Sequence, residues 1–345
     1  MVNGRPLPDM QTFYQVAKTG SLRNLQRITS PVPHVSDGKV LVEVKAIGIN
    51  YADIFAIMGL YSATPKTPFI PGLEFSGTVL SSGSPLYQPG TDVVGVTRFG
   101  GYTSHIIADP DYLMPLPDGW SYDEGCAFPV QTLTAYYALK TLGDLQKDQT
   151  VLIHSAAGGV GLQANRIARK FGAFTIGVVG NAEKMSILRE EGYDKAIVRN
   201  KKSFISELHH ALDGRELNLV LETTGGLYFR DSYKALAPMG RIIAYGSAQF
   251  TPTSHQPNYF TLIFRYLFRA RIDPLSMIKA NKSVMGFNLI WLYERKALMK
   301  SLLHEIAQLN LPAPFVGHRV PFSNLPEALE MMRKGSTIGK IVIVT

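Results

Sequence analysis

Residues 151–161 read Val-Leu-Ile-His-Ser-Ala-Ala-Gly-Gly-Val-Gly, and they decide the fold that we expect for this chain. A short strand-like run leads into a turn of small residues, and residues 162–171 then carry apolar side chains at helical spacing. Ala156, Gly158 and Gly161 make the turn an Ala-x-Gly-x-x-Gly variant of the dinucleotide-binding fingerprint. In that fingerprint, backbone N–H groups at a helix N-terminus approach a pyrophosphate.

The end of the next expected strand, residues 175–179, indicates which nucleotide fits. An NAD site normally places Asp or Glu there to bind the ribose 2′-OH, whereas this chain has Gly180, Asn181 and then Lys184. Lys184, with Arg199 after the following apolar run, could supply the positive charge that a 2′-phosphate needs. The pattern favours NADPH, although each basic residue alone is also compatible with a solvated surface charge.

Composition limits the class of protein. The chain has 345 residues, 46% hydrophobic and 18% charged, which suits a large core and two domains. Cys126 is the only cysteine, which excludes an internal disulfide framework and suits a reducing, cytoplasmic location. We expect neither a signal peptide nor a transmembrane segment, because no apolar stretch has the required form.

The net charge of +8 is spread along the chain without a basic tract or a nucleic-acid-binding motif, so we do not expect a nucleic-acid partner. The charge is compatible with a phosphate-bearing cofactor or an acyl-carrier substrate, and also with general solubility.

The order of patterns predicts an α/β protein. Up to residue 108 the chain is β-rich and suggests a barrel-like domain, and residues 122–142 are helical in pattern. Further strands at 217–221 and 241–245 continue a series of alternating strands and helices, which implies a parallel sheet with its ligand at the carboxyl ends of the strands. A closing strand at 339–344 suggests that the chain returns to the first domain.

The least regular region is 249–285, which contains an aromatic and basic run at 259–271. Three interpretations stay open for it: a cover over the substrate cleft, a contact with a second subunit, or a contact with an anionic membrane surface. Packing as a cover or subunit contact is favoured.

Several short motifs, in one order and at family spacing, resemble the zinc-independent quinone oxidoreductase branch of the medium-chain dehydrogenase/reductases, which includes zeta-crystallin-like enzymes. They are Gly-Ile-Asn-Tyr-Ala-Asp (48–53), Gly-Leu-Tyr (59–61), Pro-Gly-Leu-Glu-Phe-Ser-Gly (71–77), Thr-Ala-Tyr (134–136), Ala-Ala-Gly-Gly-Val-Gly (156–161) and Gly-Lys-Ile-Val (339–342). Within that branch, residues 282–292 look most like the vesicle amine transport protein 1 homologue group.

The resemblance implies a GroES-like catalytic domain at 1–128 and 287–345, a Rossmann NADPH-binding domain at 129–286, and a homodimer. Zinc-dependent relatives carry Cys where this chain has Asn50 and His where it has Leu73, so no catalytic metal is expected. The reaction that remains is hydride transfer from NADPH to a small-molecule quinone or enone acceptor.

The resemblance also implies roles for individual residues. Asn50 is expected at the nicotinamide ribose or the substrate oxygen, and Tyr61 is a candidate proton donor that is also compatible with simple packing. Tyr51 is a second candidate, and Asp53 is expected to cap its helix more readily than to act in catalysis. The residues expected at the cofactor are Asn50, Thr134, Ala157, Gly158, Gly159, Val160, Gly180, Asn181, Lys184, Arg199, Thr223, Tyr245, Gly246, Ser247, Phe287, Leu289 and Lys340.

Two alternative functions stay open. One is an enoyl-thioester reductase in which Tyr61 and the segment 259–279 handle the acyl carrier. The other is a nucleotide-binding, membrane-peripheral interaction protein with little turnover.

Overall fold

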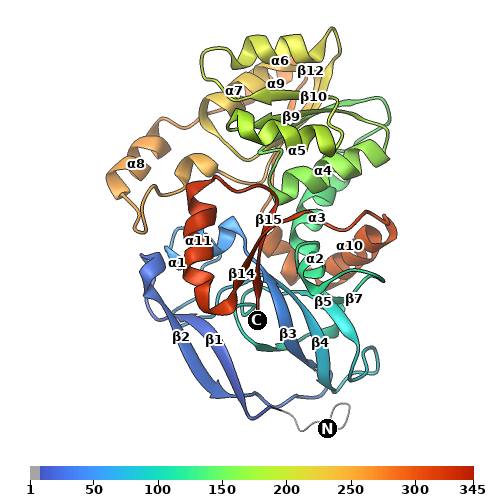
Figure 1. Ribbon diagram of the computed structural model, residues 1–345. Helices are drawn as coiled ribbons and strands as arrows, with labels where there is room; N and C mark the ends of the chain where they lie inside the picture. The colour runs from blue at the N-terminus through green and yellow to red at the C-terminus, as the bar shows by residue number, and fades with distance from the viewer. Residues whose placement is uncertain (1–7) are drawn as a thin grey trace. The chain divides into compact units, whose positions relative to one another are not determined.

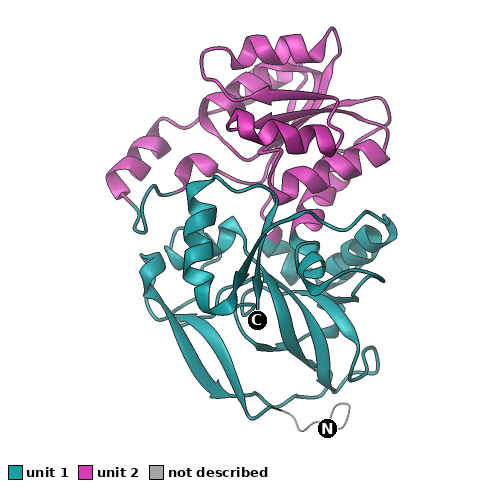
Figure 2. Cartoon of the chain, viewed as in Figure 1, with its two compact units in different colours: residues 1–130, 252–257, 290–345 teal, residues 131–251, 258–289 magenta. Residues whose placement is uncertain are grey.

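The computed structural model describes residues 8–345, and these form two compact units (Figure 2). Unit 1 holds residues 8–130, Pro252–Pro257 and Ile290–Thr345, and unit 2 holds Gln131–Thr251 and Asn258–Leu289. The domain limits expected from the sequence stay a prediction, and the first seven residues of the expected 1–128 segment lie outside the described residues.

Unit 1 is built on a seven-stranded sheet with the order β14-β15-β3-β4-β5-β7 (Figure 1). The seventh strand, β6, also pairs with β3. Only β14 and β15 pair in parallel. The last strand pairs with β3, which confirms that the chain returns to its first part. The strands are β3 (Val40–Gly48), β4 (Glu74–Ser82), β5 (Asp92–Val96), β6 (His105–Ala108), β7 (Leu113–Pro115), β14 (Val316–Pro321) and β15 (Lys340–Val344).

A hairpin of β1 (Met10–Val16) and β2 (Leu25–Pro31) forms a separate two-stranded sheet in unit 1. Its four helices among the described residues are α1 (Tyr51–Ile57), α2 (Tyr122–Cys126), α10 (Lys296–Gln308) and α11 (Leu325–Lys334). The core that β3 and β4 share with α1 and α11 includes Ile47, Ile54, Phe75 and Leu329, all fully buried. Burial of these side chains is the main stabilising term of the unit.

Unit 2 is a parallel six-stranded sheet with the order β10-β9-β8-β11-β12-β13, the doubly wound order of dinucleotide-binding folds. The strands are β8 (Thr150–His154), β9 (Phe174–Val179), β10 (Lys195–Val198), β11 (Leu217–Glu222), β12 (Leu236–Ala244) and β13 (Ser283–Gly286). The helices are α3 (Pro129–Tyr136), which begins at the end of unit 1, α4 (Gly159–Lys170), α5 (Met185–Glu190), α6 (Phe204–Leu212), α7 (Gly226–Ala235), α8 (Tyr259–Leu267) and α9 (Pro274–Ala280).

The expected α/β class and parallel sheet are therefore confirmed. The expected strand at 241–245 was too short, because β12 begins at Leu236. The strand pair β11–β12 shifts register between Leu217 and Leu219, and Met239 has a positive φ of 66°. Residues 237–240 of β12, Ala-Pro-Met-Gly, have the composition of a turn, but here they form an irregular part of the strand.

The basic aromatic segment expected at 259–271 forms α8 and the residues after it. Its large apolar side chains are largely exposed: Phe260 at 89%, Phe268 at 72% and Phe264 at 62%. In α9, Ile278 is 75% exposed. Among residues 8–345, no helix combines the length and the hydropathy needed to cross a bilayer.

Candidate functional site

The turn between β8 and α4 has the tight geometry that its small residues allow. A Cβ on Gly161 would lie 2.6 Å from Cα of Ala156, so only glycine lets α4 pack this closely on the end of β8. The first intrahelical hydrogen bond of α4 runs from the Leu162 N–H to the Gly158 carbonyl. The N–H groups of Gly159, Val160 and Gly161 come before it, so they take no part in the intrahelical hydrogen bonds. This 12-residue helix therefore presents the N-terminus that a pyrophosphate needs.

Two cationic side chains converge at the end of β9. Nη2 of Arg199 would lie 3.0 Å from a Cβ on Gly180, so the guanidinium sits directly over this glycine. Lys184 is half-buried, and burial together with the nearby Arg199 lowers the pKa of its ammonium. Two like charges held together at the carboxyl end of a parallel strand form a site that an anion would stabilise. Asn181 lies exposed beside them.

The guanidinium of Arg199 is held from its other side by the end of β11. Its Nη1 donates to Oγ1 of Thr224 at 3.2 Å, and the group lies 5.7 Å from the ring centroid of Tyr228. Glu222 accepts the N–H groups of Thr224 and Gly225, both at 2.9 Å, and so fixes the turn that presents Thr224. Burial raises the pKa of Glu222 to about 7, although these hydrogen bonds and Arg199 oppose the shift.

Phe287 lies between two tyrosines of unit 2. Its ring centroid is 5.0 Å from that of Tyr137 and 6.1 Å from that of Tyr245. Gly246 follows Tyr245 and leaves no room for a Cβ beside Oγ1 of Thr223. The structure thus brings together Thr223, Tyr245, Gly246 and Phe287 at the ends of β11, β12 and β13. Of the other expected residues, Ser247 and Leu289 are half-buried, whereas Ala157 and Thr134 are buried.

In unit 1, Asn50 belongs to a buried network. Its Nδ2 donates to Oε1 of Glu74 at 2.9 Å and to the Gly48 carbonyl at 3.2 Å, and its Oδ1 accepts from Nζ of Lys340 at 3.0 Å. Lys340 also donates to Oε1 of Glu74 at 2.5 Å, and the Val130 N–H donates to Oε2 at 2.9 Å. Both N–H bonds and the oxygen of the Asn50 amide are therefore engaged within the protein, and the residue is 7% exposed.

Asp53 fixes the start of α1. Its carboxylate accepts the Asn50 N–H at 2.8 Å, the Gly72 N–H at 3.2 Å and the Tyr102 hydroxyl at 2.9 Å. Complete burial raises its pKa to about 6, against the effect of these donors and of Lys340. The geometry agrees with the expected capping role, since all three partners belong to the protein.

The two tyrosine candidates differ in position. The Tyr51 hydroxyl donates to the Met332 carbonyl at 2.9 Å, near the C-terminus of α11, so it ties two helices of unit 1 together. Tyr61 is half-buried against the core of unit 1, and its carbonyl accepts the N–H of Thr64 at 3.0 Å. Their catalytic roles, like that of Asn50 and the cofactor contact of Lys340, stay predictions.

The donor set around Asn50 does not fit zinc. A tetrahedral zinc site needs several thiolate, imidazole or carboxylate ligands, whereas this network offers a carboxamide and one carboxylate, Glu74, which is paired with the ammonium of Lys340. Leu73 supplies no ligand atom, and Cys126 is buried with a pKa raised by that burial. Within residues 8–345, no group of three His, Cys, Asp or Glu side chains could hold a metal ion.

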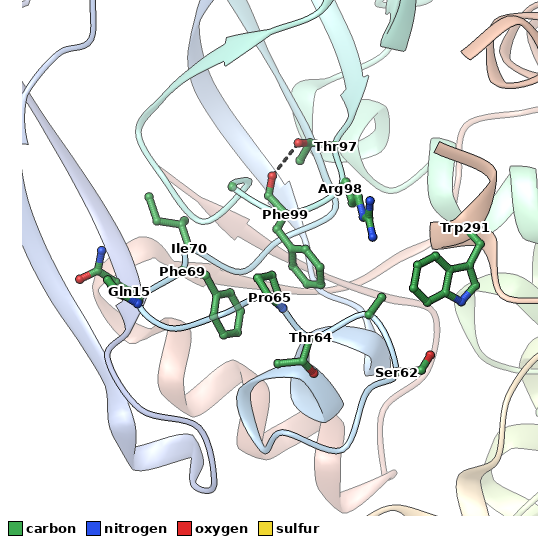
Figure 3. Close-up of a pocket in the computed structure, with 13 residues that line it drawn as sticks. Gln15, Ser62, Thr64, Pro65, Phe69, Ile70, Thr97, Arg98, Phe99 and Trp291 are labelled. Carbon is green, nitrogen blue, oxygen red and sulfur yellow. Dashed lines mark hydrogen bonds between the residues drawn. The ribbon is translucent and has the colours of Figure 1, made fainter. Parts of the chain in front are cut away.

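Unit 1 also contains a pocket of about 730 Å³ that the sequence analysis missed (Figure 3). Phe69 and Phe99 meet edge to face, with ring centroids 5.7 Å apart, and Trp291 lines the same pocket. The Arg98 guanidinium lies 5.3 Å from the Trp291 ring centroid. Arg98 and Trp291 are far apart in sequence, and the resemblance of residues 282–292 gave Trp291 no role, so only the folded chain brings the two together.

Glu74 is the other functional candidate that was missed. The available signal was a carboxylate at the start of a strand whose other residues carry no charge, because such a group needs a partner when it is buried.

Two domain families match this chain. Residues 36–118 match the alcohol dehydrogenase GroES-like domain, and residues 159–301 match the zinc-binding dehydrogenase family.

Two curated proteins illustrate the range of relatives. The zebrafish (Danio rerio) synaptic vesicle membrane protein VAT-1 homolog is 29% identical over 318 residues, which is 91% of this chain and 65% of the zebrafish protein. The highly reducing polyketide synthase cla2 of Cladosporium cladosporioides is 30% identical over 354 residues, 98% of this chain but 14% of the synthase. This chain thus spans slightly less than two thirds of the first relative and a small part of the second.

A solved structure shares the whole fold. The quinone oxidoreductase from Thermus thermophilus, which has also been solved in complex with NADPH, matches with a TM-score of 0.78 and 27% identity over 97% of this chain and all of the other. The two domain matches, these relatives and the strand order of unit 2 lead to one assignment. The chain belongs to the medium-chain dehydrogenase/reductase superfamily of oxidoreductases, in its zinc-independent quinone oxidoreductase branch near the VAT-1 homologues.

Proposed function

We propose that this protein is an NADPH-dependent oxidoreductase that delivers hydride to a quinone or an α,β-unsaturated carbonyl compound. The observation that carries the proposal is the pair of cations at the end of β9. Arg199 covers Gly180, and Lys184 has a lowered pKa beside it, so bound phosphate would relieve their mutual repulsion. A ribose 2′-phosphate distinguishes NADPH from NADH, and this site fits that group.

Different residues of unit 2 are suited to different parts of NADPH. The N-terminus of α4 is suited to the pyrophosphate, and Thr224 orients Arg199 toward the adenosine end. Phe287, held between Tyr137 and Tyr245, offers an aromatic surface for the nicotinamide end. When bound, NADPH supplies the hydride; the protein orients the cofactor and excludes water.

The test is a steady-state assay with NADPH and NADH against one quinone and one enone, with Arg199→Met as the informative variant. We expect NADPH to be preferred through KM, and the preference to fall at least tenfold in Arg199→Met, since a hydrogen bond to a charged group contributes about 1.5–3 kcal/mol. Arg215→Met is the matched control, because Arg215 also lies over an aromatic ring of unit 2, that of Phe174. Equal use of both nucleotides by the unaltered protein would refute the cofactor assignment.

A second candidate is reduction of an enoyl thioester, which the polyketide synthase relative supports because the match covers nearly the whole of this chain. Here Tyr61 is the proposed proton donor. Tyr61→Phe should lower enoyl-thioester reduction and spare quinone reduction. Tyr87→Phe is the control, since the Tyr87 hydroxyl is bound to the Leu113 carbonyl at 2.9 Å. A Tyr61→Phe enzyme with both activities intact would remove Tyr61 from the mechanism.

The exposed aromatic side chains of α8 support a third proposal, peripheral contact with an anionic membrane, and they are equally suited to a subunit contact. The expected homodimer stays a proposal of the same kind, and light scattering of the purified protein tests it.

A further inference from the structure

The pocket of unit 1 combines aromatic walls with one cationic side chain. Its volume of about 730 Å³ is in the range of small-molecule sites. Figure 3 shows the rings of Phe69 and Phe99 on one side, Trp291 across from them, and Arg98 near the space between Phe99 and Trp291. Among the described residues that line this pocket, Arg98 is the only one with a charged side chain.

The aromatic walls are held in place by the backbone. Phe99 has a φ of 129°, a conformation that a bulky residue adopts only under constraint. The Thr97 hydroxyl donates to the Phe99 carbonyl at 2.6 Å, and the Gly100 N–H donates to the Ile70 carbonyl at 2.8 Å, so the peptide bond between Phe99 and Gly100 is fixed at both its oxygen and its N–H. Strained backbone of this kind is found most often at binding and active sites.

The charge of Arg98 is available to a ligand. Its Nη1 donates to Oε1 of Glu294 at 2.9 Å, but the two side chains are 43% and 57% exposed, and an exposed ion pair of this kind is weak. The guanidinium also keeps its remaining donors beside the Trp291 ring. A carboxylate on a ring seated against Trp291 could therefore exchange with Glu294 and accept two parallel hydrogen bonds.

We propose that this pocket binds planar ring compounds that carry an acidic group, with Arg98 as the residue that recognises the acid and Phe69, Phe99 and Trp291 as the surfaces that hold the ring. The inference goes beyond the proposed function, because it assigns a ligand class to a pocket of unit 1 that none of the expected cofactor residues lines.

The test uses inert probes and the full chain without nucleotide. Calorimetry compares 2-naphthoate with its neutral isostere 2-naphthamide. We expect the carboxylate to bind about five- to tenfold more tightly, and Arg98→Gln to abolish that preference. Glu294→Gln should increase the affinity for naphthoate, since it releases Arg98.

Arg319→Gln is the matched control. Arg319 also belongs to unit 1, is 53% exposed and pairs with Asp123 at 2.6 Å, but it does not line the pocket. Its replacement should leave the preference intact. Equal binding of the two probes, no binding of either, or an equal loss in Arg319→Gln would overturn the proposal.

A parallel titration of the same preparation with NADPH separates the two claims. Nucleotide binding and quinone turnover without a naphthoate preference would refute this inference alone. A naphthoate preference that depends on Arg98, in a protein that binds no nucleotide, would refute the proposed function and leave the pocket's ligand class standing.

Discussion

Replacing Lys340 by methionine tests the buried network of unit 1 directly. The side chains of Lys340 and Glu74 are 4% and 0% exposed, so the change removes the ammonium group that pairs with a carboxylate in the interior. The Asn50 amide and the Val130 N–H, both neutral, still donate to Glu74. They cannot replace a full charge, and the loss of one partner of a buried pair costs about 3–5 kcal/mol.

Tryptophan fluorescence measures this effect within unit 1. The two tryptophans of the chain, Trp120 and Trp291, both belong to that unit, so urea unfolding followed by their emission reports its transition. We expect Lys340→Met to lower the free energy of unfolding by about 3–5 kcal/mol. The double variant Lys340→Met/Glu74→Gln should lose less than Lys340→Met alone, because a neutral amide then replaces the buried carboxylate.

The control is Lys300→Met, which breaks a pair with Asp111 in which the lysine is 62% exposed and which should cost about 0–1 kcal/mol. A Lys340→Met protein as stable as this control would refute the buried-pair argument. So would a double variant that loses the sum of its single changes, because the two residues would then act independently.

Three further predictions concern other parts of the chain. Lys184→Ala should weaken NADPH binding at least tenfold in a fluorescence titration and leave NADH unchanged, whereas the exposed control Lys195→Ala should change neither; an unaltered NADPH affinity would contradict the 2′-phosphate site. Asp53 has a folded pKa of about 6, above its ordinary value of 3.8, so its contribution to stability is complete below about pH 4 and is lost as the pH rises to 6. Between pH 4 and 6, the free energy of unfolding measured in urea should thus fall less in Asp53→Asn than in the unaltered protein. Identical pH profiles for the two proteins would rule out the raised pKa of Asp53. For α8, Phe260→Asp should reduce co-sedimentation with anionic liposomes at physiological salt, and an unaltered protein that remains in the supernatant would exclude the membrane proposal.

The parts of the molecule that follow from neighbouring residues could be predicted from the sequence. The turn at Gly158 and Gly161 has local requirements, small residues and a helix after a strand, and these are visible in eleven consecutive letters. The capping role of Asp53 is equally local, because the residue lies three positions after Asn50. The parallel sheet of unit 2 follows from the alternation of strands and helices along the chain.

Features that depend on distant residues could not be predicted in this way. The resemblance suggested a cofactor contact for Lys340, but its nearest partners, Asn50 and Glu74, lie 290 and 266 positions earlier in the chain. The meeting of Arg98 with Trp291 likewise depends on the packing of unit 1. The start of β12 was missed because the bulge around Met239 has turn-like composition, and pairing with β11 overrides that local preference.

The position of β15 has a consequence for synthesis on the ribosome. β3 is translated almost three hundred residues before β15, one of its antiparallel neighbours, which at typical elongation rates is a delay of roughly 15–60 s. All of unit 2 emerges within that interval, while the edge of β3 that later receives β15 is paired with β6 at Val40–Glu43 but lacks its partner at Ala46–Gly48. An uncovered edge is a template for pairing with another chain, so the nascent polypeptide passes through a period in which aggregation competes with completion of the sheet.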